Sequence, residues 1–251
     1  MSDLHLLTIE IENGGQRQSI APVLLQDERD VVLVDCGYPD SMEKLEAAAG
    51  RYGLSLGSIT KLIVTHHDLD HIGSLAALKE AYPHIAVIAH EREVPYVQGI
   101  KRSLRLQQAE STLADLPDEL KPGAEQFIRS LASVEPAVVD QIVSHGEKLP
   151  WCGGIEVVHT PGHMPGHISL YLPGSKTLIA GDAVVYENGQ LDIANPHFAL
   201  DLKEAVRSVQ RLLAYDIEQI VCYHGGWFRG DVQKELCRLI DSYQERSGEA
   251  R

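Results

Sequence analysis

The sequence predicts an α/β fold, in which short apolar strands alternate with amphipathic helices. The clearest unit consists of a strand at residues 60–64, a helix that ends at about Ala81 and a second strand at residues 85–89. A strand, a helix and a strand in this order indicate a parallel pair. A second observation is that several predicted strands end in a His or Asp beside Gly or Pro. Loops at strand ends commonly carry the chemistry of a protein, so this pattern predicts a site there.

The chain before this unit is predicted to be mostly β. Strands are expected at residues 4–11, 19–25 and 31–36. Asn13-Gly14-Gly15 is typical of a turn, and the polar residues 26–30 indicate that the last two strands form an antiparallel hairpin. Asp40 or Ser41 is then expected to cap a helix that runs to about Tyr52.

The chain after the unit begins with a predicted helical insert, from Glu91 to about Pro136, which is charged and has no strong strand signal. The insert could be a lid, a homodimer surface or a set of ordinary surface helices. Further strands are expected near residues 138–143, 151–159, 168–172, 177–180 and 217–222, a loop at 187–198, and helices at 201–215 and 231–246. There is no repeat or linker, so residues 1–251 are expected to form a single domain.

The polar segment after residue 64 carries the strongest functional signal. His66, Asp68 and Asp70 alternate, so in an extended loop they can project to one side, and His71 follows at the turn into a helix. Imidazole and carboxylate together suit a divalent transition metal. For each residue alone a simpler interpretation is open, such as Asp70 capping the helix or His66 being solvated. Four such groups in six residues favour a metal site, and indicate two ions.

Other predicted strand ends repeat the pattern. Asp35, His163, Asp182 and His224 each stand at a strand end beside or near Gly. Glycine lets the backbone turn sharply and approach an ion closely. If the side chains converge, they could hold two ions that share a bridging carboxylate.

Composition limits the classes of partner. The chain has 36 Asp and Glu against 22 Lys and Arg, for a net charge of −14. This charge disfavours nucleic acid and anionic membrane surfaces as partners, and a small-molecule substrate is expected instead. The four cysteines form no C-x-x-C pair, and the N-terminus has no signal-peptide pattern, so a cytoplasmic location is expected.

These motifs carry a resemblance. His66-His67-Asp68-Leu69-Asp70-His71, Thr160-Pro161-Gly162-His163, Gly181-Asp182 and His224-Gly225 resemble, in order, the motifs of the metallo-β-lactamase fold. The resemblance implies a four-layer αβ/βα sandwich with a two-metal site at one end, and makes Asp35 a structural neighbour. It also implies the ligands of one ion (His66, Asp68 and His163), the ligands of the other (Asp70, His71 and His224) and a bridging residue (Asp182). A hydroxide between the ions would then be the nucleophile.

The departure from the family pattern is Asp68, where the family usually has His. Three carboxylates and one hydroxide would neutralise two divalent ions, which is expected to weaken the Lewis acidity of the site. Zinc is the expected metal, but the harder oxygen ligand makes iron or manganese possible. Asp68→His is expected to change metal preference without destroying the fold. The family's flavodiiron branch also has a carboxylate there, although this chain lacks a flavodoxin-like extension.

The sequence therefore predicts a metal-dependent hydrolase that opens an ester, lactone, thioester or amide. An iron-dependent oxidoreductase and a non-catalytic metal-binding protein are the alternatives. Asp70 and Tyr186 are the candidate catalytic residues, because the resembling lactonases have a Tyr near this position. His67 is expected to point away from the ions, His167 to lie under the site, and His197 to lie on a surface loop or contact substrate.

Overall fold

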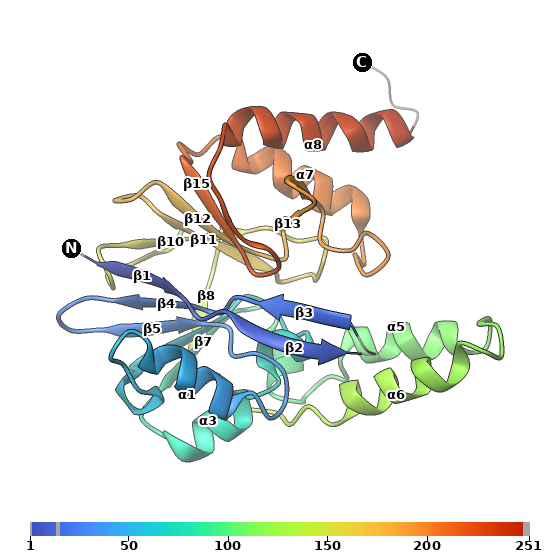
Figure 1. Ribbon diagram of the computed structural model, residues 1–251, viewed down its shortest axis with the longest axis horizontal. Coiled ribbons are helices and arrows are strands. Elements are labelled where there is room, and N and C mark those ends of the chain that lie inside the picture. Colours follow the sequence, from blue (N-terminus) through green and yellow to red (C-terminus); the bar gives the residue numbers. More distant parts are fainter. Residues whose placement is uncertain (1, 14–15, 248–251) are drawn as a thin grey trace.

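The computed structural model describes residues 2–13 and 16–247, and its main feature is a pair of six-stranded sheets packed face to face (Figure 1). The first sheet contains, in spatial order, β1 (Asp3–Leu6), β4 (Val23–Gln26), β5 (Val31–Val34), β6 (Lys61–Val64), β7 (Ala86–His90) and β8 (Gln141–Val143). The second contains β16 (Gly226–Phe228), β15 (Gln219–Cys222), β12 (Thr177–Gly181), β11 (Ile168–Leu172), β10 (Ile155–His159) and β9 (Lys148–Leu149).

Helices cover the outer face of each sheet, so the predicted four-layer sandwich is confirmed. The first sheet is covered by α1 (Met42–Gly50) and α3 (Leu75–Ala81), and the second by α7 (Leu202–Leu212) and α8 (Val232–Ser247) (Figure 1). A short 3-10 helix, η1 (Leu56–Ser58), precedes β6. Strand alternation explains the layers: Leu62 and Val64 pack toward the helices, whereas Ile63 packs between the sheets.

The predicted parallel unit is confirmed, because β5, β6 and β7 are parallel neighbours, and so is the antiparallel hairpin of β4 and β5. The predicted strands at 4–11 and 19–25 are each interrupted, which gives a separate pair, β2 (Ile9–Asn13) and β3 (Gln16–Ile20). The cause is Pro22, which has no N–H to donate and instead accepts a hydrogen bond from the Leu7 N–H (2.8 Å). Gly14 and Gly15 of the predicted turn lie outside the described residues.

The segment from residue 91 to 136 contains three helices, α4 (Val94–Val97), α5 (Leu104–Leu113) and α6 (Lys121–Ala132). The last two form an antiparallel pair that extends from the end of the sandwich (Figure 1). Leu106 of α5 and Leu131 of α6 pack on Leu69 of the short helix α2 (Leu69–Ile72). This contact places α5 directly beside the polar loop that follows β6.

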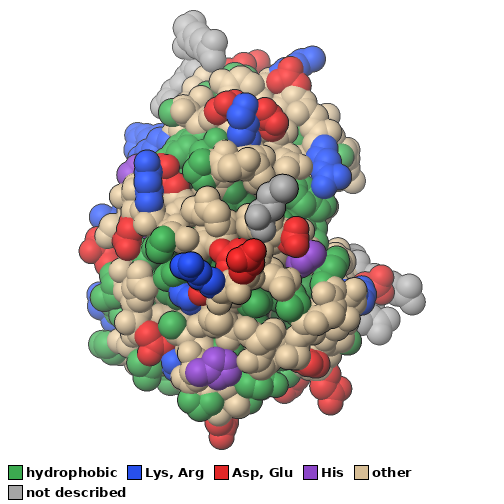
Figure 2. All heavy atoms as spheres, turned by 90° about the vertical axis from the view of Figure 1, so that its left-hand side faces the viewer, with side chains coloured by type: hydrophobic (Ala, Val, Ile, Leu, Met, Phe, Trp, Pro, Cys, Tyr) green, Lys and Arg blue, Asp and Glu red, His purple; other side chains and the backbone are tan. Residues whose placement is uncertain are grey.

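The expected loop at residues 187–198 is partly wrong, since a hairpin of β13 (Val185–Glu187) and β14 (Gln190–Asp192) overlaps it. Asn188 and Gly189 both have positive φ, as a tight two-residue hairpin turn requires. Of the helices that the structure describes, none is both long and apolar enough to cross a membrane. On the face shown in Figure 2, Lys and Arg side chains are scattered among acidic ones.

Candidate metal centre

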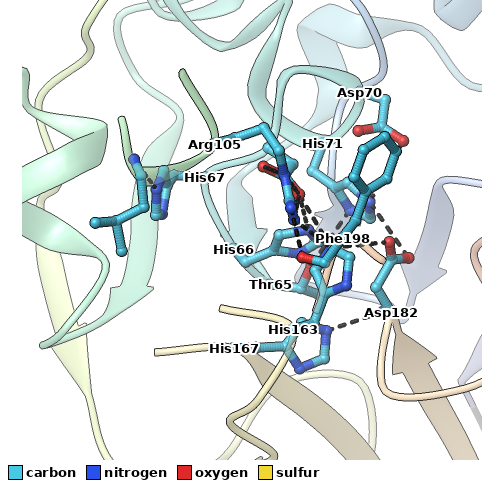
Figure 3. A network of polar contacts seen from close by, with 12 residues as sticks. Thr65, His66, His67, Asp70, His71, Arg105, His163, His167, Asp182 and Phe198 are labelled. Atoms are coloured by element: carbon cyan, nitrogen blue, oxygen red, sulfur yellow. Dashed lines mark hydrogen bonds and ion pairs between the residues drawn. The ribbon is translucent and has the colours of Figure 1, made fainter. Parts of the chain in front are cut away.

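The strand ends that the sequence singled out meet at one place. β5 and β6 are parallel neighbours in the first sheet, and β12 and β15 are parallel neighbours in the second. Their carboxyl ends therefore deliver their following loops to a common edge of each sheet, and the loop between β10 and β11 adds His163. Figure 3 shows side chains from both sheets converging there. The structure brings together all seven residues that the resemblance implied as ligands: His66, Asp68, Asp70, His71, His163, Asp182 and His224.

The spacing of these side chains suits metal coordination. His163 Nε2 lies 3.0 Å from Asp68 Oδ2, and His224 Nε2 lies 3.2 Å from Asp70 Oδ2. Asp182 lies between the two pairs, with its carboxylate oxygens 3.6 Å from each histidine Nε2. Around a tetrahedral zinc with bonds of about 2.1 Å, neighbouring ligand atoms are about 3.4 Å apart. The carboxylate of Asp182 is therefore placed where a bridging ligand would be.

Three buried atoms test the fit independently. In the described part of the chain, His66 Nε2, His71 Nε2 and Asp182 Oδ1 are buried and have no hydrogen-bond partner. The ligand atoms of these three residues lie within 4.8 Å of one another. Leaving buried polar atoms unsatisfied costs free energy, and the great majority of them in proteins have a partner. A divalent cation is the partner that two imidazoles and a carboxylate suit, so the residues fit the metal that the sequence predicts.

The electrostatics of the centre keep its carboxylates ionised. Burial alone would raise the pKa of Asp182, but His224 and His71 hold that pKa well below its usual value. Burial likewise opposes ionisation of Asp68, whose pKa Arg105 and His163 hold well below normal. Two anionic groups are therefore available to a cation.

Asp35 orients His71 from behind the centre. Its Oδ2 accepts hydrogen bonds from His71 Nδ1 (2.8 Å) and Thr65 Oγ1 (2.7 Å), and its Oδ1 accepts one from the Thr65 N–H (2.8 Å). Because Nδ1 then carries the proton, the Nε2 lone pair of His71 faces the centre. Asp35 thus has the structural position that the resemblance implied.

His167 fixes the bridging residue in the same way. His167 Nε2 accepts a hydrogen bond from the Asp182 N–H (2.8 Å), and His167 Nδ1 bonds to Thr160 Oγ1 (2.9 Å). Burial lowers the pKa of His167 to about 3, so the ring stays neutral and the tautomer is set by its two partners.

His67 points away from the centre, as strand alternation predicts. Its Nδ1 pairs with the buried carboxylate of Glu93, and its ring stacks on Tyr96 with centroids 4.4 Å apart. Glu93 also accepts hydrogen bonds from the backbone N–H groups of His67 (3.0 Å) and Gly166 (2.7 Å). This carboxylate joins the loops of the two sheets. No sequence motif pointed to it.

Arg105 is the main residue that sequence reasoning missed. It extends from α5 into the centre, where its Nη2 lies 2.8 Å from Asp68 Oδ2 and 3.1 Å from His163 Nε2 (Figure 3). The residue is 2% exposed. An Arg in a charged amphipathic helix ordinarily suggests a solvated surface, so the sequence carried no signal for this contact.

A cavity of about 120 Å³ opens over the centre. It is lined by Asp68, Asp70, His163, Asp182, Val185, Glu187, Ala194, Asn195, Phe198 and His224. The Tyr186 ring packs instead against Phe228, with centroids 5.5 Å apart, because alternation along β13 turns it away from the cavity. This geometry does not support the oxyanion role expected of Tyr186. His197 is exposed.

Position 225 shows why glycine follows His224. A Cβ on Gly225 would lie 1.9 Å from the carbonyl oxygen of Tyr186, and φ there is +99°. Any other residue would push the hairpin of β13 and β14 away from the end of β15. Since that hairpin forms a wall of the cavity, Gly225 helps fix the cavity's shape.

Comparison with known protein families gives a match to a model described as the metallo-beta-lactamase superfamily, over residues 17–224. The chain is 28% identical over 240 residues to the probable metallo-hydrolase YflN of Bacillus subtilis, covering 88% of this chain and 83% of that protein. It is 28% identical over 176 residues to a hydroxyacylglutathione hydrolase of Brucella ovis, covering 70% of this chain and 52% of that protein.

Solved structures show the same fold. The metallo-beta-lactamase family protein TTHA1429 from Thermus thermophilus superposes with a TM-score of 0.77 at 24% identity, covering 97% of this chain and 80% of that one. The metallo-beta-lactamase IND-7 superposes with a TM-score of 0.67 at 17% identity, covering 95% and 94% of the two chains.

Proposed function

Because the chain belongs to the metallo-β-lactamase superfamily, we propose that it is a metal-dependent hydrolase that opens an ester, lactone, thioester or amide of a small molecule. The observation that carries this proposal is the convergence of His66 Nε2, His71 Nε2 and Asp182 Oδ1, three buried atoms without a hydrogen-bond partner. Two of them belong to residues whose other side is fixed by Asp35 or His167.

The seven clustered side chains are the proposed ligands, with zinc as the expected metal and iron or manganese as possible ones. A divalent ion there lowers the pKa of a bound water toward neutrality and polarises a substrate oxygen. The chain's own contribution is orientation, because Asp35 and His167 hold His71 and Asp182 in fixed tautomers and positions.

Asp70 is the proposed catalytic carboxylate. It lines the cavity, and its Oδ2 lies 3.2 Å from His224 Nε2, so one oxygen faces the centre. A carboxylate in this place can orient the reacting water and hold its proton. Val185, Ala194 and Phe198 line the wall of the cavity, where they exclude bulk water from the substrate.

Substrate chemistry is tested with a panel. The protein is stripped of metal, reloaded with zinc, manganese or iron, and assayed on lactones, glutathione thioesters, β-lactams and phosphodiesters. The relatives named hydroxyacylglutathione hydrolases favour the glutathione thioesters as a first choice. We expect hydrolysis of at least one carbonyl substrate, restored only when metal is added back.

Two variants separate the centre from the rest of the chain. His71→Asn removes a proposed ligand, and we expect it to abolish both metal retention and hydrolysis. His84→Asn changes an exposed histidine and should alter neither. The proposal fails if the metal-free protein hydrolyses as fast as the reloaded one, or if His71→Asn stays active. Dioxygen uptake by iron-loaded protein, without hydrolysis, would support the oxidoreductase alternative instead.

A further inference from the structure

The guanidinium of Arg105 lies inside the group formed by His66, Asp68 and His163. Its Nε lies 3.1 Å from Asp68 Oδ1 and its Nη2 lies 2.8 Å from Asp68 Oδ2, a two-pronged contact with the carboxylate. The same Nη2 lies 3.1 Å from His163 Nε2. Arg105 therefore contacts two of the three side chains that would hold one of the two ions.

A neutral imidazole nitrogen has one lone pair, and this decides between the two cations. If Arg105 Nη2 donates its hydrogen bond to His163 Nε2, that lone pair is used, because guanidinium is only a donor. If Nε2 instead carries a proton, it donates to Asp68 Oδ2 at 3.0 Å. In either arrangement His163 Nε2 has no lone pair for an ion. Metal binding by His163 and its present contact with Arg105 exclude each other.

Contacts outside the centre hold Arg105 in this place. Its Nη1 donates to Gln108 Oε1 (2.6 Å) and to the carbonyl oxygen of Phe198, and the guanidinium lies 4.9 Å from the centre of the Phe198 ring. These partners come from α5 itself and from the loop after β14. The position of the guanidinium is therefore set by the chain on several sides, and not by Asp68 alone.

We propose that Arg105 takes the place of one of the two ions, so that the chain binds a single divalent cation tightly. The inference rests on the proposed function for that remaining ion, which is held by Asp70, His71, Asp182 and His224. His71 Nε2 and Asp182 Oδ1 have no hydrogen-bond partner, so that group is open where the first is closed.

This assignment accounts for the carboxylate at position 68. Asp68 offers two oxygens to the planar fork of a guanidinium, the geometry in which Arg and carboxylate pair most strongly. The histidine usual at this position would offer at most one lone pair. Asp68 and Arg105 are therefore a matched pair, which supplies a fixed positive charge without a second ion.

Metal stoichiometry tests the inference without any substrate. Metal-free protein is dialysed to equilibrium against increasing zinc, and bound zinc is counted per chain by elemental analysis. We expect a plateau at one ion for the wild type. Arg105→Met removes the guanidinium while keeping an unbranched side chain, and should raise the plateau to two. Arg102→Met, in which an exposed Arg that pairs with Glu110 is lost, is the matched control and should stay at one.

A second measurement keeps the test decisive if Arg105→Met folds poorly. Cobalt titration of the wild type, followed by visible absorption, should saturate at one equivalent. Two equivalents of comparable affinity in the wild type, or a plateau of one in folded Arg105→Met, would overturn the inference while leaving the hydrolase proposal intact. Failure of the wild type to retain any ion would overturn the hydrolase proposal as well.

Discussion

Asp35 shows how one residue behind the ligands can control the centre. Its two oxygens accept three hydrogen bonds, from the Thr65 N–H, from Thr65 Oγ1 and from His71 Nδ1. An asparagine in its place would have a single carbonyl oxygen, so its amide group would face one of these donors. We expect Asp35→Asn to lower zinc affinity about 10- to 100-fold, the usual effect of losing a residue that orients a ligand.

Competition with a chromogenic chelator measures this affinity. Asp40→Asn is the matched control, because Asp40 has nearly the same left-handed backbone (φ 64°, against 60° at Asp35) but is exposed. Asparagine tolerates this backbone conformation, so neither variant introduces strain. Equal zinc affinity for Asp35→Asn and the wild type would show that His71 needs no orienting partner.

At the scale of residues, the sequence predicted the clustered groups because they lie in short motifs at strand ends. It could not predict Glu93 or Arg105, since each acts through partners distant in the chain. Arg105 is 37 positions from Asp68, and Glu93 is 73 positions from Gly166. Neither residue type nor local periodicity distinguishes such a residue from an ordinary charged residue of a helix.

Helix α5 is the element whose docking depends most on the centre. Its apolar contact is small, with Leu106 packing on Leu69 and Leu131, and the Arg105–Asp68 pair adds a buried electrostatic contact. The sequence suggested that Asp68→His would leave the fold intact. The structure changes this expectation, because the substitution leaves the Arg105 guanidinium buried without a carboxylate.

We therefore expect Asp68→His to lower the free energy of unfolding by about 3–5 kcal/mol, the usual cost of breaking a buried ion pair from one side. Urea denaturation of metal-free protein measures it. Adding Arg105→Met to the same chain removes the unpaired charge and should recover most of the loss. A single variant as stable as the wild type would mean that α5 docks independently of Asp68.

The errors in the predicted elements have local causes. Strand propensity continues through residues 19–25, but Pro22 ends the ladder there and redirects the chain into the β2–β3 pair. The β13–β14 hairpin was hidden by its three-residue strands, although Asn188-Gly189 is a strong turn signal. Register and strand length depend on tertiary contacts, so hydrophobic pattern alone could not fix either.

The molecule as a whole is two αβ layers that close on each other, and a histidine pair crosses the junction. His90 ends β7 in the first sheet and His159 ends β10 in the second, and their rings stack with centroids 4.2 Å apart and planes within 8°. Burial, together with His159, lowers the pKa of His90 to about 4. Protonation of this pair therefore opposes contact between the two halves.

The sign of the pH effect follows from that lowered pKa. Because His90 binds its proton less readily in the folded chain, the unfolded chain is protonated first as the pH falls below about 6.5. The contribution of neutral His90 to stability is complete above that pH and is lost as the pH approaches 4. Between these values we expect the wild type to lose about 1–3 kcal/mol more than His90→Phe, which keeps a stacked ring but binds no proton.

Urea denaturation of metal-free protein at several pH values measures the difference, and His84→Asn controls for loss of an exposed histidine. Carboxylates also titrate in this range, but they do so equally in all three proteins, so the comparison isolates His90. Parallel curves of unfolding free energy against pH for the wild type and His90→Phe would show that the pair does not couple the two halves to pH. A shallower curve for His90→Phe alone would identify the stacked pair as the acid-sensitive contact between the sheets.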